Sequence, residues 1–306
     1  MYRLQLIAAG TLAAALILPL DVRAQEDSAS QRVQAITLER EGRTDEAEQI
    51  WSALAKADPN DAEALGHLGL LEARHEQYEA AIDYYRRAAV LNPDLPGLQM
   101  NMGLAFFKVG QFPDAIRIFS SEIKKHLGDQ RLTILLGMAH YGMKDYLVAD
   151  PYLRRAIEQD PQSIPLRLTL AHSCLASKQY SCVIKVRNEI AALNAESAEA
   201  DMLAAQACDQ LQDSSGAAKQ LRAALAINPG EPNAHFGLGY LLWAQGKWAE
   251  ASAEFQLELQ NDPRHAPAQD YLADAQRKMN HAAATLSPPR PAALQDLIDS
   301  IENPAP

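Results

Sequence analysis

Residues 62–95 read AEALGHLGLLEARHEQYEAAIDYYRRAAVLNPDL, and residues 232–265 read PNAHFGLGYLLWAQGKWAEASAEFQLELQNDPRH. Both stretches contain a Leu-Gly pair, a central Ala, an aromatic residue and a closing Pro at the same distances from one another. In the first stretch these are Leu68-Gly69, Ala81, Tyr85 and Pro93, and in the second they are Leu238-Gly239, Ala251, Phe255 and Pro263. Self-similarity at a fixed period is the sequence signature of a repeat protein.

The same four positions recur along the chain at a period of 34 residues, without insertions. The first position is always Gly or Ala: Ala35, Gly69, Gly103, Gly137, Ala171, Ala205, Gly239 and Ala273. The second is Ala with one exception: Ala47, Ala81, Ala115, Ala149, Val183, Ala217 and Ala251. The third is large and apolar with one exception: Trp51, Tyr85, Phe119, Leu153, Arg187, Leu221 and Phe255. The fourth is Pro59, Pro93, Pro161, Pro229 or Pro263, with Leu127 and Ala195 as exceptions.

Each of these positions has a physical reason in a helical hairpin. Small residues at the first and second positions let two antiparallel helices approach closely, and the large third residue fills the space beside them. Proline ends the unit because it cannot continue a helix. A polar turn, such as Arg74 to Gln77, lies between the first two positions, so each unit is expected to be helix, turn, helix.

The period of 34 with these conserved spacings resembles the tetratricopeptide repeat. The resemblance implies an all-α fold, a right-handed α-solenoid of seven 34-residue helix-turn-helix repeats with a C-terminal capping helix. The expected repeats are 28–61, 62–95, 96–129, 130–163, 164–197, 198–231 and 232–265, and the expected cap is 266–282. Members of the family are mostly scaffolds and adaptors.

Two units depart from the pattern. The third lacks its closing Pro, and the fifth has Val183, Arg187 and Ala195 at pattern positions, so we expect the fifth to be the least regular.

The segments outside the solenoid, which is expected at 25–285, have different compositions. Residues 1–24 are typical of a signal peptide, with Arg3, an apolar run from Leu4 to Leu18 and a cleavage site after Ala24. The alternative is an uncleaved anchor, although the run is short for a membrane span. Residues 286–306 form a Pro-rich linker and an amphipathic tail with apolar residues at Leu294, Leu297, Ile298 and Ile301. The tail either packs on the cap or docks in a groove, of a partner or of this chain.

The resemblance also implies a concave groove lined by the first helix of each repeat, at the positions three before, one after and four after the Gly/Ala position. The predicted partner-binding residues are Leu70, Met100, Leu104, Phe107, Met138, Tyr141, His172, Tyr240 and Trp243. Related positions hold Ile134, Leu168, Leu175, Met202 and Phe236. This surface is apolar, which favours an apolar or amphipathic peptide as partner. The alternative is that these residues only pack between neighbouring helices.

Some members of the family bind an acidic peptide C-terminus with Lys and Asn at fixed groove positions. Gly66, Leu70 and Leu135 occupy three of those five positions here, which argues against such a clamp.

The three cysteines are Cys174, Cys182 and Cys208. The first two are symmetric about a predicted hairpin turn, so they are either a disulfide or two buried thiols. We expect no metal, no cofactor and no catalytic site, because neither ligand spacings nor nucleophile motifs occur. The net charge of −11 argues against nucleic acid as a partner.

These observations predict an exported scaffold or adaptor, periplasmic or secreted, that binds another protein or peptide through its groove in envelope assembly or secretion. It is expected to be a monomer with no stable membrane insertion after cleavage. The alternative is a structural spacer without a groove ligand, and an enzyme is the least favoured reading.

Overall fold

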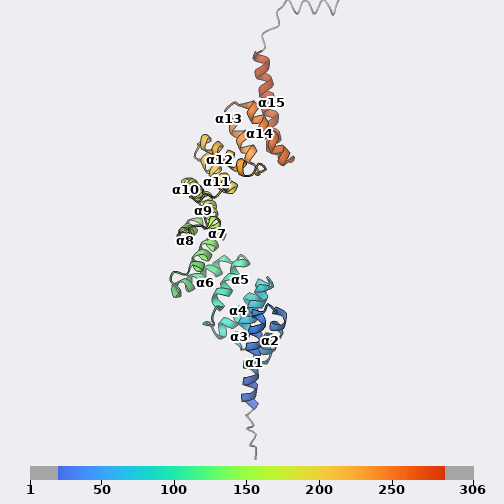
Figure 1. Ribbon diagram of the computed structural model, residues 1–306, viewed down its shortest axis with the longest axis vertical. Coiled ribbons are helices and arrows are strands. Elements are labelled where there is room, and N and C mark those ends of the chain that lie inside the picture. The colour runs from blue at the N-terminus through green and yellow to red at the C-terminus, as the bar shows by residue number, and fades with distance from the viewer. Residues whose placement is uncertain (1–19, 287–306) are drawn as a thin grey trace, which may run out of the picture. The chain divides into compact units, whose positions relative to one another are not determined.

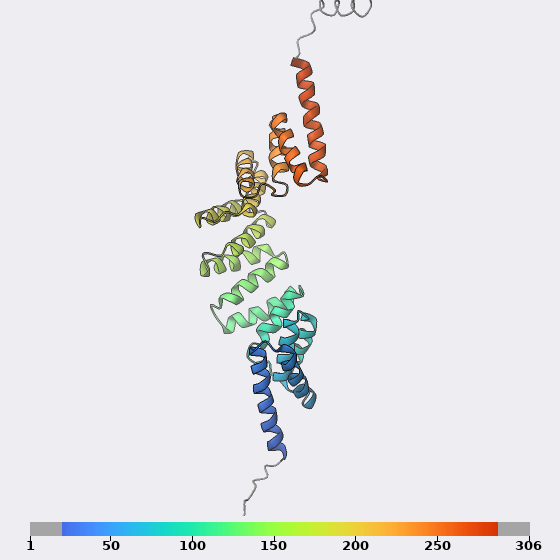
Figure 2. The ribbon, with the colours of Figure 1, turned by 45° about the vertical axis from the view of Figure 1, so that its right-hand side comes forward.

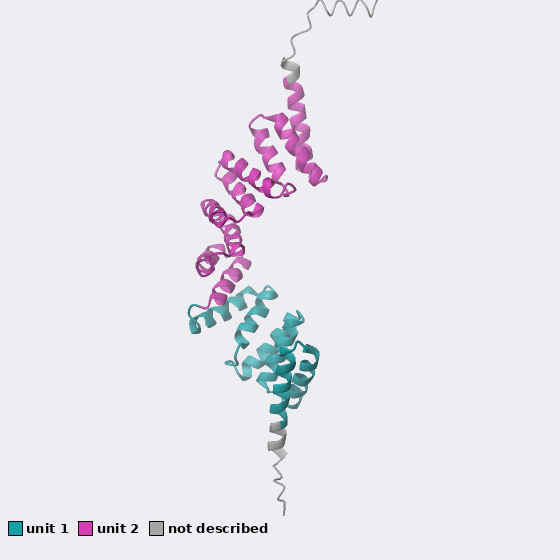
Figure 3. Cartoon of the chain, in the orientation of Figure 1, with its two compact units in different colours: residues 1–128 teal, residues 129–306 magenta. Residues whose placement is uncertain are grey.

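The computed structural model describes residues 20–286, with side chains from residue 27 to residue 282. The chain divides into two compact units, Met1–Gly128 and Asp129–Pro306 (Figure 3). The described residues form fifteen α-helices and no strand, which confirms the all-α prediction. The boundary between the units falls after Gly128, where the third predicted repeat lacks its closing Pro.

Unit 1 is a stack of three helical hairpins (Figure 1). Its helices are α1 (Leu20–Arg40), α2 (Thr44–Ala57), α3 (Ala62–Arg74), α4 (Tyr78–Leu91), α5 (Leu98–Lys108) and α6 (Phe112–Lys125). Each helix packs against the next one along the chain, and α3 also touches α5, the first helix of the next hairpin.

Unit 2 continues the same plan with four hairpins and a final helix (Figure 2). Its helices are α7 (Gln130–Gly142), α8 (Tyr146–Gln159), α9 (Ile164–Ala176), α10 (Tyr180–Ala192), α11 (Ala198–Gln210), α12 (Ser214–Ile227), α13 (Ala234–Ala244), α14 (Trp248–Asn261) and α15 (Ala266–Leu286). First helices of successive hairpins touch in the pairs α9 with α11 and α13 with α15. Because α15 packs on α14 and α13, it covers the end of unit 2, as the sequence predicted for a capping helix.

In four hairpins the periodic Gly of the first helix packs against the large residue of the second helix. A Cβ atom built on Gly69 would come within 2.7 Å of the Tyr85 ring, and one on Gly103 would come within 2.5 Å of the Phe119 ring. In unit 2, a Cβ on Gly239 would lie 2.7 Å from Phe255. These aromatic rings are almost fully buried, and each ring occupies the space that a Cβ methyl group would need.

Each hairpin turn contains one residue in the left-handed backbone conformation, again at a period of 34 residues. These residues are Gly42, Glu76, Gly110, Lys144, Lys178, Gln212 and Gly246, with φ angles between 60° and 76°. Glycine adopts this conformation without steric cost, whereas other residues are disfavoured there by about 1–2 kcal/mol. The turn therefore imposes the same backbone geometry on every hairpin, whether or not the residue suits it.

The closing Pro acts on the residue before it. Asp58, Asn92, Asp160, Asn228 and Asp262 each precede a Pro, follow a second helix directly, and have φ between −127° and −145°. Pro disfavours the helical conformation in the preceding residue, so the helix ends at that point.

The fifth predicted repeat replaces apolar packing with an ion pair. Arg187 of α10 stands where the other repeats have a large apolar residue, and its Nε donates to Asp201 Oδ1 of α11 at 2.6 Å. The Asp201 carboxylate is buried, so the arginine supplies the partner that a buried charge requires. This repeat therefore differs from the others in the residue types at its pattern positions and in the end of α10, which is not followed by a closing Pro.

The predicted signal peptide and tail fall largely outside the described residues, which begin at Leu20 and end at Leu286. Within the described part of the chain, no helix has both the length and the apolarity needed to cross a membrane.

We predict that Gly103→Ala lowers the free energy of unfolding by about 1 kcal/mol. Overpacking against Phe119 costs about 1–3 kcal/mol, and the better helix propensity of Ala recovers about 1 kcal/mol. Urea denaturation followed by far-UV circular dichroism measures the change. Gly137→Ala is the matched control, because its new Cβ would meet Leu153 at the wider distance of 3.1 Å, and it should cost less. A Gly103→Ala protein as stable as the parent would contradict the packing argument.

Candidate functional site

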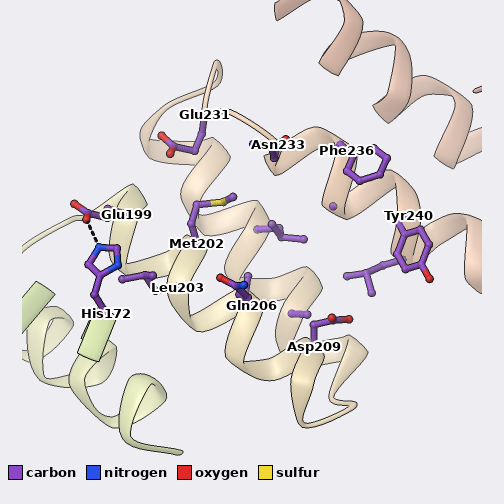
Figure 4. A pocket seen from close by; sticks show the side chains of 15 residues that line it. His172, Glu199, Met202, Leu203, Gln206, Asp209, Glu231, Asn233, Phe236 and Tyr240 are labelled. Carbon is purple, nitrogen blue, oxygen red and sulfur yellow. Dashed lines mark hydrogen bonds and ion pairs between the residues drawn. The ribbon is translucent and has the colours of Figure 1, made fainter. Parts of the chain in front are cut away.

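A cavity of about 550 Å³ opens on unit 2, on the side formed by the first helices of three successive hairpins. It is lined by residues of α9, α11, α12 and α13 and of the segment that joins α12 to α13 (Figure 4). Its volume lies within the range of about 300–1,000 Å³ that is typical of ligand sites. The cavity therefore has the size of a binding site, and residues of first helices form much of its lining.

Helix α11 forms the floor of the cavity. Ser197 caps its N-terminus by accepting a hydrogen bond from the Ala200 N–H. The outward side chains Glu199, Met202, Gln206 and Asp209 recur at intervals of three or four residues, which places them on one face of the helix. The α11 surface thus presents one apolar side chain between polar ones.

Helix α13 forms the opposite wall and is more apolar. It contributes Phe236, Gly237, Tyr240 and Leu241. A Cβ on Gly237 would lie 3.2 Å from Leu221 of α12, so the missing side chain helps to keep the cavity open beside Leu221. Tyr240 is 41% exposed, which makes its ring available to a ligand.

The charged groups of the cavity are mainly acidic. Glu199, Asp209 and Glu231 lie at separate edges of the site, around Met202 and Gln206 (Figure 4). The Glu199 carboxylate is 2.6 Å from His172 Nε2, and Glu231 accepts a hydrogen bond from the Asn228 side chain at 2.8 Å. Among the described residues that line the cavity, none is Lys or Arg.

Tyr141 of α7 lies close enough to this site to be affected by its charge. Burial raises the pKa of its phenol, and the nearby Tyr146 and Glu199 raise this pKa further. Its ring contacts Tyr146 edge to face, with centroids 5.6 Å apart. Tyr141 and Met138, both of unit 2, are partly buried and pack against the core around α9.

Of the predicted groove residues, His172 and Tyr240 line the cavity, whereas Trp243 is engaged by the capping helix. The Trp243 indole N–H donates to Asp274 Oδ2 at 2.9 Å, and its ring lies edge to face against Tyr271. The Lys278 ammonium lies 4.8 Å from the centre of the same ring. With these contacts from α15, Trp243 is half-buried.

The predicted groove residues of unit 1 do not line this cavity. Leu70 lines a smaller cavity of about 210 Å³ together with His67, Tyr85 and Asn101. Phe107 packs edge to face on Phe112, with ring centroids 5.5 Å apart. Met100 and Leu104 are half-buried on α5.

The polar part of the site was not predicted from the sequence. Gln206 and Asp209 occupy the positions one after and four after Ala205, so they satisfy the same positional rule as Met202. Both are polar, whereas the predicted groove residues are apolar or aromatic except for His172. Glu231 and Asn233 lie between helices, where the rule does not apply.

Cys174 of α9 and Cys182 of α10 are joined in a disulfide, with Cα atoms 5.9 Å apart. Arg154 of α8 donates to Cys182 Sγ at 3.0 Å. The third cysteine, Cys208, is a buried thiol whose pKa is raised by burial and by the charge of Asp213. The disulfide ties together the hairpin whose first helix carries His172.

Three segments, residues 32–96, 100–164 and 202–266, match a family model described as Tetratricopeptide repeat. Together they cover more than half of the chain, and the interval between the second and third coincides with most of the fifth predicted repeat. The exact number of repeats stays a prediction.

Among curated proteins, BBSome complex member BBS4 of Bos taurus is 24% identical over 215 residues, which are 70% of this chain and 41% of the relative. This chain therefore corresponds to less than half of the length of that protein.

Among solved structures, the C-terminal part of a TPR repeat-containing protein from Cytophaga hutchinsonii is 16% identical with a TM-score of 0.66. The match covers 78% of this chain and 98% of that one. A tetratricopeptide repeat protein from Parabacteroides merdae is 15% identical with a TM-score of 0.51, covering 82% and 99% of the two chains. At these identities the likeness shows the fold alone.

We predict that replacing both Cys174 and Cys182 by Ser lowers the free energy of unfolding by about 2–3 kcal/mol, the value expected for a short disulfide-closed loop. Thermal unfolding with and without a thiol reductant measures the effect. The reductant should lower the Tm of the parent and leave that of the double variant unchanged. A parent Tm that does not respond to complete reduction, verified by mass spectrometry, would show that the bridge does not stabilise the fold.

Proposed function

Because the chain belongs to the tetratricopeptide repeat family, we propose that it is a scaffold that binds a polypeptide partner in the cavity between α9, α11 and α13. Proteins of this family are generally non-enzymatic scaffolds that bind other proteins or peptides. The cavity carries the proposal, because it combines a ligand-sized volume with first-helix residues from three successive hairpins.

The composition of the cavity suits a polypeptide. Met202, Phe236 and Leu241 offer apolar contact area, and Met is adaptable enough to fit side chains of different shapes. Gln206 and Asn233 add amide groups that can bond to a peptide backbone. Apolar contacts with a few polar groups that fix orientation are the usual composition of a specific binding site.

The proposal includes export from the cytoplasm, with a role in envelope assembly or secretion. Two independent features support export. The apolar run from Leu4 to Leu18 follows a basic residue and precedes a cleavage-like site at Ala24. The Cys174–Cys182 disulfide is of a kind that persists in oxidising compartments and is rare in the cytosol.

A photo-crosslinking residue at position 206 tests the docking site in the cells that make the protein. Gln206 is exposed and lines the cavity, so a crosslinker there should capture a polypeptide. Gln256, which is exposed on α14 and does not line the cavity, is the matched control position. We expect capture at position 206 to exceed capture at 256 by about tenfold or more, and to be lost when Phe236→Ala is added. Equal capture at the two positions would favour a spacer role instead.

Export predicts a defined N-terminus. N-terminal sequencing of the protein isolated from its own cells should begin at Gln25, and Ala24→Arg should leave the first 24 residues attached. Isolation of a chain that still begins at Met1 would remove the support that cleavage gives to an exported scaffold.

A further inference from the structure

The acidic edges of the cavity restrict the kind of partner that fits it. Glu199, Asp209 and Glu231 face the cavity from three sides, and the Glu199 side chain is 53% exposed. The only basic side chain among the described lining residues is His172, which already contacts Glu199. A ligand that brings positive charge to these edges gains Coulomb energy, whereas an acidic ligand is repelled.

The interior of the cavity requires an apolar group. Between the acidic edges lie Met202, Leu203, Phe236 and Leu241, and the cavity volume of about 550 Å³ is large enough for several side chains. A purely cationic ligand would leave this surface in contact with water. The complementary ligand therefore carries large apolar side chains between positive charges.

A lysine of this chain already lies against an aromatic ring next to the cavity. Tyr240, which lines the cavity, and Trp243 form a row of two rings. The rings of Tyr240 and Trp243 stack with centroids 6.1 Å apart, and the Lys278 ammonium lies 4.8 Å from the centre of the Trp243 ring. Asp274 neutralises that ammonium at 3.6 Å. Tyr240, the next ring in the row, offers an exposed face of the same kind with Asp209 on the opposite wall of the cavity.

Charge also argues against two occupants from this protein. The C-terminal tail, residues 287–306, contains Arg290 as its only Lys or Arg and three acids, Asp296, Asp299 and Glu302. A second copy of the chain carries a net charge of −11. Both would bring negative charge to a negative site.

We infer that the cavity between α9, α11 and α13 binds a basic amphipathic segment of another protein. Its apolar side chains would lie on the apolar residues of the cavity interior, and its Lys or Arg side chains at Glu199, Asp209 and Glu231. This inference rests on the proposed function, because it names the chemistry of the partner for the same cavity.

Three fluorescent synthetic peptides test the inference by anisotropy with the purified protein. Each has about 14 residues, enough for three to four helical turns. The first carries Leu at intervals of three and four residues with Lys elsewhere, the second replaces Lys by Glu, and the third keeps Lys but replaces Leu by Ser. We expect only the first to bind, and its Kd to rise with ionic strength.

Two pairs of protein variants separate the cavity from the rest of the surface. Gln206→Trp fills the cavity, and Gln256→Trp is its control on α14. The triple change Glu199→Gln, Asp209→Asn and Glu231→Gln removes the three acidic edges. Its control, Glu158→Gln, Glu250→Gln and Asp270→Asn, removes three exposed acids of unit 2 that do not line the cavity and changes the net charge equally.

The expected result is a Kd for the Lys/Leu peptide that rises about tenfold or more in Gln206→Trp and in the cavity triple variant, and less than about twofold in both controls. If the Glu/Leu peptide binds the parent protein instead and its binding is lost in the Gln206→Trp variant, the cavity is a docking site but the inferred basic partner is wrong. If both triple variants weaken binding equally, the attraction is one of net charge, and the inference fails. If Gln206→Trp weakens no peptide, both the inference and the proposed docking site fail.

Discussion

The close contact between a small residue on one helix and a large side chain on the next governs this structure. Where Gly69 meets Tyr85, or Gly239 meets Phe255, the two helices of a hairpin come so near that a single methyl group would overlap the ring. This contact sets the spacing of the hairpins that have it, and the hairpin spacing sets how the first helices line up in a stack. The cavity of unit 2 is lined by residues of α9, α11 and α13, the first helices of three successive hairpins.

The sequence predicted the helices well because the small and large positions act locally, within one hairpin. It gave less information on the turns. A residue in the left-handed conformation recurs in every hairpin turn, but it is Gly in only three of them. In the other four it is Glu76, Lys144, Lys178 or Gln212, residue types that do not predict this conformation. The ion pair between Arg187 and Asp201 could not be predicted from the sequence either. It joins α10 to α11 and depends on which side chains meet across that interface.

The site was predicted in part for the same reason. His172 and Tyr240 follow from a positional rule within each first helix, and the structure brings both to the cavity. Glu199, Asp209 and Glu231 give the site its negative charge, but an acidic residue on a helix surface looks the same in sequence whether it lines a cavity or only faces solvent. Trp243 satisfies the rule and also contacts Tyr271, Asp274 and Lys278 of α15, which the rule could not predict because it describes one helix and takes no account of what packs on it.

Within each unit the helices touch mainly their neighbours along the chain, a property with mechanical consequences. Such a stack behaves as a set of springs in series, in which a small change at each contact adds to a larger bend. Helices α11 and α13, which both line the cavity, belong to adjacent hairpins of unit 2. The proposed partner, bound between them, would stiffen that part of the stack, and by reciprocity a force that bends the stack would change how tightly the partner is held.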